Sequence, residues 1–270
     1  MSGTLYIVAT PIGNLEDLSL RALSTLKEVG LIAAEDTRVT RKILNRFKFK
    51  TPIISFNEHN SAKHTPKIIK SLMDSDVALV CDAGTPLISD PGRILVDSAR
   101  ENGYRVSPIP GPSSITASIS VAATKSSGFC FVGFLPRGGT ARTNLFRSIK
   151  GGKEALVFFE SPHRLISTLK IITEISPTVR LTICRELTKL HEEIWQGFPE
   201  QACKHFEKPL GEFVVILEPD LANKEKDHPD SLDLKIQLTK LKEAGLSRNA
   251  ASALLAKQLK LPKREIYKNW

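Results

Sequence analysis

Residues 81–92, CDAGTPLISDPG, combine two glycines, two prolines and two aspartates directly after an apolar run. Gly84 has no side chain and Pro86 restricts the turn, so a ligand can approach the backbone closely. Exposed amide and carbonyl groups, flanked by the carboxylates of Asp82 and Asp90, suit a ligand with polar edges and little negative charge. A purely structural turn would have a similar composition, so this segment alone does not establish a binding site.

The usual phosphate-binding loops are absent from the sequence. It contains neither G-x-x-x-x-G-K-S/T nor a G-x-G-x-x-G segment between a strand and a helix, and Asp82 would repel a phosphate. The cysteines and histidines show no C-x-x-C, H-x-x-x-H or H-E-x-x-H spacing, which are patterns typical of metal ligands. The sequence therefore disfavours nucleotide ligands and predicts no protein-bound metal.

Six further segments resemble the first in their position. Each follows an apolar run and gathers polar or turn-forming residues where that run ends. Because the carboxyl ends of parallel strands meet at one edge of a sheet, we expect these segments to form one cleft. The segments are ATPIGN (residues 9–14), EDTR (35–38), SFNEHN (55–60), PGPSS (110–114), FESPHR (159–164) and CRELTKLHEE (184–193).

The elements that must position these segments alternate between strand and helix patterns. A first series predicts a mostly parallel sheet covered by helices on both faces, and a second series follows the Pro-Gly-Pro turn at residues 110–112. We predict two α/β domains, residues 1–112 and 113–220. Strands are expected at residues 5–9, 31–34, 77–81, 104–109, 129–134, 155–159, 181–184 and 213–217, with a short strand or hairpin at 194–198; helices are expected at 18–29, from 66, at 92–101 and from 162.

The composition changes after residue 220. Residues 222–233 are charged and are predicted to form a linker, and helices are expected at 234–244, from 247 and from 262. Residues 221–270 therefore read as a linker followed by a helical, helix-turn-helix-like tail. The basic residues of this tail are compatible with an RNA-contacting module and equally with an amphipathic cap on the main body.

The overall composition is that of a globular protein. Of 270 residues, 41% are hydrophobic and 25% are charged, and the formal net charge of +9 favours a polyanionic partner, nucleic acid above all. No apolar run is long enough for a signal peptide or a transmembrane helix. We therefore expect a cytoplasmic protein with no membrane association.

Together with LYIVATPIGNLEDLSLRAL (residues 5–23), the motifs resemble those of the ribosomal RNA small subunit methyltransferase I family, over about residues 4–218. The resemblance implies the tetrapyrrole methylase fold, with two α/β domains, a cleft between them that binds S-adenosylmethionine, and a homodimer. It also implies 2′-O-methylation of a cytidine ribose in the decoding region of 16S rRNA, with 16S rRNA or the 30S subunit as partner.

The resemblance assigns the cofactor contacts to the strand-end motifs. They come from the first loop, the 81–92 segment, the Pro-Gly-Pro-Ser turn and the ends of the later strands. The implied cofactor-binding residues are Ile12, Gly13, Asp82, Gly84, Thr85, Ile88, Ser113, Ser114, Phe159, Glu160, Cys184, Arg185 and Glu212.

Methyl transfer from a sulfonium is an in-line displacement, to which alignment can contribute about 7–11 kcal/mol and a general base about 10²- to 10⁴-fold. The candidate bases in the strand-end motifs are Asp36, Glu58, Glu160, Glu186 and Lys189. Our hypothesis is that Lys189 or Glu186 assists proton removal, with Asp36 as a further catalytic candidate. The residues expected to contact RNA are Arg38, Arg41, Lys42 and Arg164.

Two other functions fit parts of the sequence. A methyltransferase acting on a corrin or porphyrin would share the fold, although the calculated pI of about 9.4 and the basic tail disfavour it. An rRNA-binding assembly factor without catalysis would share the charge but would not modify the RNA.

Overall fold

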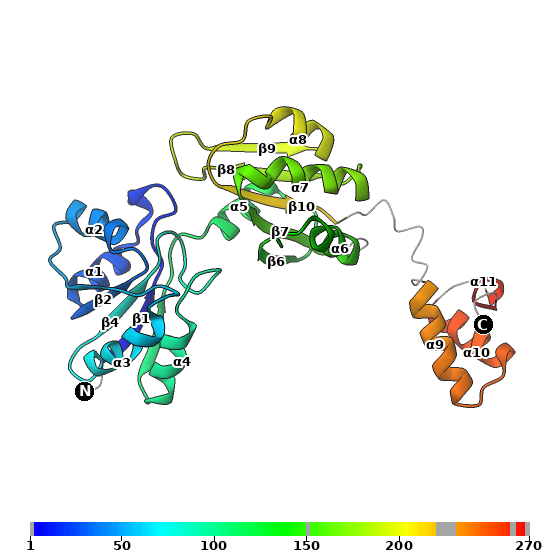
Figure 1. The fold of residues 1–270 in the computed structure, drawn as a ribbon, viewed down its shortest axis with the longest axis horizontal. Coiled ribbons are helices and arrows are strands. Elements are labelled where there is room, and N and C mark those ends of the chain that lie inside the picture. Colours follow the sequence, from blue (N-terminus) through cyan, green and yellow to red (C-terminus); the bar gives the residue numbers. More distant parts are fainter. Residues whose placement is uncertain (1–2, 150–151, 220–230, 260–262, 268–270) are drawn as a thin grey trace. The chain divides into compact units, whose positions relative to one another are not determined.

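The computed structural model describes residues 3–149, 152–219, 231–259 and 263–267. The chain divides into two units, Met1–Asp220 and Leu221–Trp270. The first unit contains two five-stranded sheets, and the described part of the second contains helices (Figure 1). In the described part of the chain, none of the helices is long and apolar enough to cross a membrane.

The first sheet is parallel throughout, with the strand order β3-β2-β4-β1-β5. Its central strand β4 has the sequence VALV and is buried along its whole length, as expected for a strand covered on both faces. All five carboxyl ends therefore lie at one edge of this sheet. The strands are β1 (Thr4–Val8), β2 (Leu31–Ala34), β3 (Ile53–Ser55), β4 (Val77–Val80) and β5 (Arg105–Ile109).

Helices cover both faces of this sheet (Figure 1). Helices α1 and α2 pack with Val8 and Val80 on one face, and α3 and α4 pack with Leu5 and Leu79 on the other. The apolar periodicity of each helix thus points to the sheet. The helices are α1 (Leu20–Glu28), α2 (Thr37–Arg46), α3 (Ser61–Ser71) and α4 (Arg93–Glu101), with a short 3₁₀ helix, η1 (Leu15–Asp17), after the first strand.

The second sheet is mixed, with the order β6-β7-β10-β8-β9. Strand β10 runs antiparallel to both β7 and β8, so β7 and β8 run in the same direction. The carboxyl ends of β7 and β8 consequently lie beside the start of β10. The strands are β6 (Phe129–Phe134), β7 (Ala155–Glu160), β8 (Leu181–Arg185), β9 (Glu193–Gly197) and β10 (Phe213–Leu217).

Helices also cover the second sheet on both faces. Phe158 and Val215 belong to a core with α6, α7 and α8, whereas Val157 and Ile216 belong to a core with α5. Ile12, from the loop after β1, joins the α5 core, which connects the first sheet to the second. The helices are α5 (Ser114–Ala122), α6 (Gly139–Ile149), α7 (Pro162–Ile175) and α8 (Pro199–His205).

The predicted fold class is confirmed, and the structure corrects some element boundaries. Helix α3 begins at Ser61, five residues before the expected start at Pro66, which lies inside the helix. The buried stripe of α3 begins with two polar residues, Ser61 and Thr65, before it reaches Ile68, so apolar periodicity alone did not detect the first turns. The division of the first unit at residue 112, within the turn between β5 and α5, stays our proposal.

The second unit has a small core of its own. Leu238, Ala251, Leu255 and Ile266 are buried together between its helices. Most of the predicted linker lies outside the described residues. The described helices are α9 (Ser231–Glu243), α10 (Arg248–Leu259) and α11 (Lys263–Tyr267).

Candidate functional site

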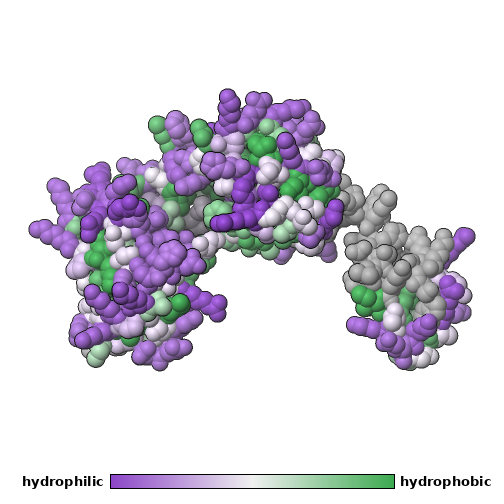
Figure 2. All heavy atoms as spheres, in the orientation of Figure 1, coloured by the Kyte–Doolittle hydropathy of each residue, from purple (hydrophilic) through white to green (hydrophobic). Residues whose placement is uncertain are grey.

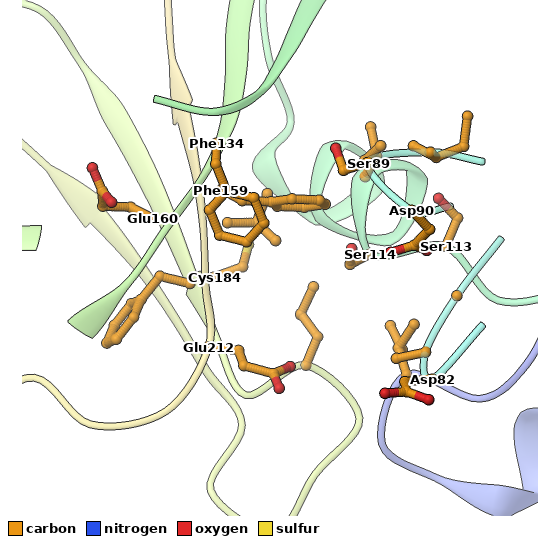
Figure 3. Close-up of a pocket in the computed structure, with 18 of the residues that line it drawn as sticks. Asp82, Ser89, Asp90, Ser113, Ser114, Phe134, Phe159, Glu160, Cys184 and Glu212 are labelled. Carbon is orange, nitrogen blue, oxygen red and sulfur yellow. The ribbon is translucent and has the colours of Figure 1, made fainter. Parts of the chain in front are cut away.

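A pocket of about 420 Å³ lies between strand ends of the two sheets (Figure 3). Its volume falls within the range of small-molecule sites. Asp82, Asp90 and Ser114 line one side, and Phe159 and Glu212 line the opposite side. Of the predicted cofactor-binding residues, all except Gly13 and Arg185 line this pocket.

The loop after β4 is held by hydrogen bonds with the loops that follow β1 and β5. Thr10 and Gly84 exchange two backbone hydrogen bonds, of 2.8 and 3.0 Å, which form an isolated antiparallel bridge. The hydroxyl group of Thr10 donates to the carbonyl of Cys81 at 3.0 Å, and that of Thr85 donates to the carbonyl of Pro112 at 3.3 Å. The pocket wall is thereby fixed to the loops that follow β1 and β5.

The same loop contains backbone strain. Leu87 and Ser89 adopt positive φ values of 70° and 67°, in the left-handed region that disfavours residues with a side chain. Gly84, with φ at 79°, occupies a position for which glycine is well suited. Such strain persists only where surrounding contacts over-determine the conformation, and it concentrates at functional sites.

Three carboxylates gather at the first-sheet side of the pocket. Burial raises the pKa of Glu35, of Asp82 and of Asp90. Mutual repulsion adds to this effect, since Asp82 and Asp90 both raise the pKa of Glu35, and Asp82 raises that of Asp90. A cation bound nearby would relieve this repulsion, so the pocket favours a ligand that carries positive charge.

A second strained loop closes the other side of the pocket. Glu186 and Thr188, directly after β8, have φ values of 50° and 66°. The ammonium group of Lys189 lies 2.9 Å from Oε1 of Glu186 and 3.0 Å from Oε2 of Glu212. The backbone amide of Glu212 also donates to Oε1 of Glu186 at 2.9 Å. Lys189 is therefore anchored at the pocket rim through Glu212, which lines the pocket.

The ionisation of this cluster follows from its contacts. Partial burial lowers the pKa of Lys189, but its hydrogen bonds to Glu186 and Glu212 outweigh this effect, and the net pKa is raised. Burial likewise raises the pKa of Glu186, but hydrogen bonds from Lys189 and from the Glu212 backbone bring the net pKa below its ordinary value. At neutral pH Lys189 is a cation and Glu186 is an anion.

The two predicted cofactor residues outside the pocket lining have structural contacts. Gly13 packs under the second loop: a Cβ atom there would lie 2.5 Å from Cγ of Lys189 and 2.6 Å from Oγ1 of Thr188. The neighbouring amide of Asn14 donates to Oγ1 of Thr188 at 3.1 Å. Arg185 donates through Nε to the carbonyl of Leu210 at 2.6 Å. These contacts position the pocket wall.

The contacts of Asp36 argue against its predicted catalytic role. Its carboxylate caps helix α2 and binds Arg38, with Oδ2 at 2.6 Å from Nη2. The hydrogen bonds from the Arg38 side chain and backbone lower the pKa of Asp36 to about 2. Such a weak base, placed outside the pocket lining, is poorly suited to proton removal, and we do not carry this assignment further.

The contacts of Arg164 favour a structural role over the predicted RNA-binding role. Its Nη2 donates to the carbonyls of Leu135 and Pro136, both at 2.8 Å. Its Nε lies 3.3 Å from Oε1 of the buried Glu160, an ion pair without hydrogen-bond geometry. Oε2 of Glu160 accepts a hydrogen bond of 2.7 Å from Thr168. The guanidinium group thus holds together the ends of β6 and β7, which form part of the pocket wall.

Several pocket residues were not assigned from the sequence. Glu35 directly follows β2, and Asp90 lies in the loop after β4, both within the motifs quoted above. Their position after a strand of the parallel sheet is a signal that could have identified them. Phe134 and Gly211 lie outside the motifs, and only the three-dimensional structure brings them to the pocket. Conversely, Glu58 in the SFNEHN motif is not among the described residues that line the pocket, since β3 is the edge strand.

No group of three or more His, Cys, Asp or Glu among the described residues is placed to hold a metal ion.

Replacing Arg164 with alanine should destabilise the fold and leave RNA affinity unchanged. The variant loses two hydrogen bonds and leaves Glu160 buried without its cation, which costs roughly 1–3 kcal/mol, or a fall in Tm of roughly 2–10 °C. Arg164→Lys should lose most of the same stability, because an ammonium group cannot reach all three partners in this geometry. Thermal unfolding and an RNA-binding titration measure both effects.

Arg147→Ala is the matched control for Arg164, since Arg147 is an exposed arginine on α6. Its Tm should stay within about 2 °C of the wild type. An Arg164→Ala variant with normal Tm and weakened RNA binding would support the predicted RNA-binding role of Arg164.

Asp82→Asn should raise Tm at pH 7.5. A carboxyl group whose folded-state pKa is raised costs stability above that pKa and costs nothing below its unfolded pKa, where both states are protonated. Asparagine keeps the acceptor oxygen for the Asp36 amide. We expect a higher Tm at pH 7.5 and no difference from the wild type below about pH 4, where both states of the carboxyl group are protonated. Asp74→Asn, an equal charge change at an exposed residue outside the pocket lining, is the control; equal Tm changes in both variants would refute the interpretation.

The sequence profile of the family Tetrapyrrole (Corrin/Porphyrin) Methylases matches residues 4–202. Curated proteins with high sequence identity cover most of the chain. The ribosomal RNA small subunit methyltransferase I of Thermotoga maritima is 50% identical over 218 residues, which cover 80% of this chain and 98% of the relative. The protein of the same name from Synechocystis is 40% identical over 271 residues, covering 98% and 96%.

Solved structures share the fold at much lower identity. Uroporphyrin-III C-methyltransferase from Thermus thermophilus has a TM-score of 0.56 at 18% identity, covering 83% of this chain and 98% of that chain. Diphthine synthase has a TM-score of 0.62 at 15% identity, covering 80% and 90%. The profile match and the curated relatives show that this chain belongs to the ribosomal RNA small subunit methyltransferase I family, within the tetrapyrrole methylases.

Proposed function

We propose that this protein transfers a methyl group from S-adenosylmethionine to the 2′-hydroxyl of a cytidine in the decoding region of 16S rRNA. The observation that carries the proposal is a pocket with strained walls and three crowded carboxylates in a chain that is 50% identical to an rRNA methyltransferase. The names of the relatives support rRNA as the substrate class. The cytidine and its 2′-oxygen come from the motif resemblance.

The pocket residues fit S-adenosylmethionine in charge and polarity. When bound, this cofactor supplies a methyl group already activated by a sulfonium. Glu35, Asp82 and Asp90 would attract its positive charges, and the hydroxyl groups of Ser113 and Ser114 in the pocket lining would offer hydrogen bonds. Apolar side chains, including Phe159, would cover its uncharged parts and exclude water from the reacting atoms.

Lys189 is our candidate for assisting proton removal. Because its hydrogen bonds with Glu186 and Glu212 keep it protonated, Lys189 does not accept the proton itself. It assists proton removal as a cation that stabilises negative charge developing on the ribose oxygen, while the hydroxyl proton passes to solvent at the pocket opening. Glu186 then serves as a positioning residue, since it holds the ammonium group in place. This division of roles fits the lowered pKa of Glu186, which makes it a weak base.

The basic face of α2 is our candidate for binding rRNA phosphates. Arg38, Arg41 and Lys42 are exposed on this helix, which begins two residues after Glu35 in the pocket wall. Hydrophilic side chains dominate the surface over α2 (Figure 2). Phosphates held there would bring an adjacent ribose to the pocket.

We further infer a cytoplasmic homodimer that acts on the 30S subunit or its rRNA. Support for the dimer comes from the edge strand β6, where Phe129, which does not line the pocket, is 44% exposed. Apolar side chains exposed on an edge strand favour association.

Lys189→Ala should reduce single-turnover methyl transfer by roughly 10²-fold, with donor affinity changed little. Glu186→Gln should reduce the rate less, because the amide can still accept a hydrogen bond from Lys189. If Lys189 acts as a cation, the rate should fall as the pH rises through its raised pKa, whereas a lysine acting as a base would give the opposite slope. Near-normal rates in both variants, with RNA binding intact, would remove this assignment.

The function itself is tested by incubating the protein with labelled donor and either 30S subunits, naked 16S rRNA or tetrapyrroles. We expect label in the RNA only, and loss of one 2′-O-methylcytidine from the rRNA nucleosides of a deletion strain. Label in a tetrapyrrole would favour the corrin or porphyrin alternative. RNA binding without any label would favour the assembly-factor alternative.

A further inference from the structure

The second unit lies outside the part of the chain that matches the family profile, residues 4–202. Residues 231–270 nevertheless contain nine Lys or Arg and only three Asp or Glu, a formal excess of six positive charges in a chain whose total is +9. Two-thirds of the net charge is thus concentrated in 40 of 270 residues. The catalytic unit does not account for this concentration.

The described helices gather some of these charges on one surface. The guanidinium group of Arg248, at the start of α10, lies 4.0 Å from the ring centre of Tyr267 in α11. Its Nη2 also donates to the carbonyl of Tyr267 at 2.6 Å. The ion–ring contact and the hydrogen bond fix the plane of the arginine against the ring.

Lys263 and Arg264 extend this surface along α11. They precede Tyr267 by four and three residues, so all three side chains lie on neighbouring positions of the helix. Lys263, Arg264 and Tyr267 are exposed, whereas Ile266 between them is buried in the core of the unit. We call Arg248, Lys263, Arg264 and Tyr267 the basic–aromatic patch.

The positive charge of the patch indicates which kind of partner it can bind. Residues 1–220 also carry a formal excess of four positive charges, so the first unit does not complement the patch. A polyanion does, through phosphate contacts with Lys263 and Arg264. An aromatic ring paired with an arginine plane offers stacking surfaces that unpaired RNA bases use. The combination fits RNA better than an acidic protein, which would not require the ring.

We propose that the basic–aromatic patch is a second RNA-binding site, which binds small-subunit rRNA outside the segment that enters the pocket. This inference rests on the proposed function for the identity of the RNA. The patch contributes affinity and placement and takes no part in methyl transfer. Its loss should therefore raise the RNA concentration needed for half-maximal rate and leave the rate at saturating RNA unchanged.

The test uses the full chain with Lys263→Ala and Arg264→Ala combined. Binding to a 16S rRNA fragment that spans the decoding region is titrated from 50 to 300 mM KCl. We expect roughly tenfold weaker binding near 150 mM KCl, and a log–log salt slope reduced by about one for each cation removed. Tyr267→Ala should weaken binding roughly fivefold, and Tyr267→Phe, which keeps the ring, should not.

Lys67→Ala combined with Lys70→Ala is the matched control. Both lysines are exposed on α3 of the first unit, and their removal subtracts the same charge. We expect the control to bind RNA within about twofold of the wild type. Thermal unfolding and S-adenosylhomocysteine titration of each variant confirm that fold and donor binding are intact.

Each outcome decides the proposal. Equal losses in the patch variant and the control would overturn it, because charge alone would then explain binding. Unchanged binding of naked rRNA, with weaker binding of the assembled 30S particle, would also overturn it in favour of a protein partner. If the patch variant loses RNA affinity but the wild type transfers no methyl group, the second RNA-binding site is supported and the proposed function fails. If the wild type transfers the methyl group normally and the patch variant binds RNA as the wild type does, the proposed function is supported and the second RNA-binding site is refuted.

Discussion

Electrostatic repulsion within the pocket is the constraint on which the site depends. Burial and mutual proximity raise the pKa of Glu35, Asp82 and Asp90, so these carboxylates are less stable as anions here than they would be in water. The fold tolerates this cost because the loops that carry these residues are tied to neighbouring strands, as in the Thr10–Gly84 bridge. A positively charged ligand would convert the repulsion into attraction, and the same residues would then contribute both affinity and selectivity.

The opposite wall of the pocket holds a cation, Lys189, in a fixed position. Lys189 is held by two carboxylates, and the turn that carries it requires positive φ values at Glu186 and Thr188. Gly211 allows this arrangement, because a Cβ atom there would lie 2.6 Å from Cγ of Glu186. Strain, ion pairing and a close backbone approach thus occur together on both sides of the pocket, as is typical of sites organised before the ligand arrives.

The motifs predicted much of this pocket because parallel strands bring polar strand ends to one edge, so the 81–92 and 110–114 segments could be placed from the pattern alone. The sequence could not show which partners a charged side chain binds within the folded protein. Arg164 and Asp36 were assigned to RNA binding and catalysis, yet both are used within the protein, by Glu160 and Arg38. Nor could periodicity reveal the reversed strand β10, whose start brings Gly211 and Glu212 beside β8.

The contact between Gly13 and Lys189 has a consequence for biosynthesis. The loop after the first strand obtains its final neighbours only when a segment some 175 residues later has emerged and folded. The first sheet can assemble early from local parallel units, whereas the binding site is completed late. A nascent chain interrupted before β8 would carry a finished scaffold with an open, repulsive half-site, unable to sequester the donor before the whole enzyme is present.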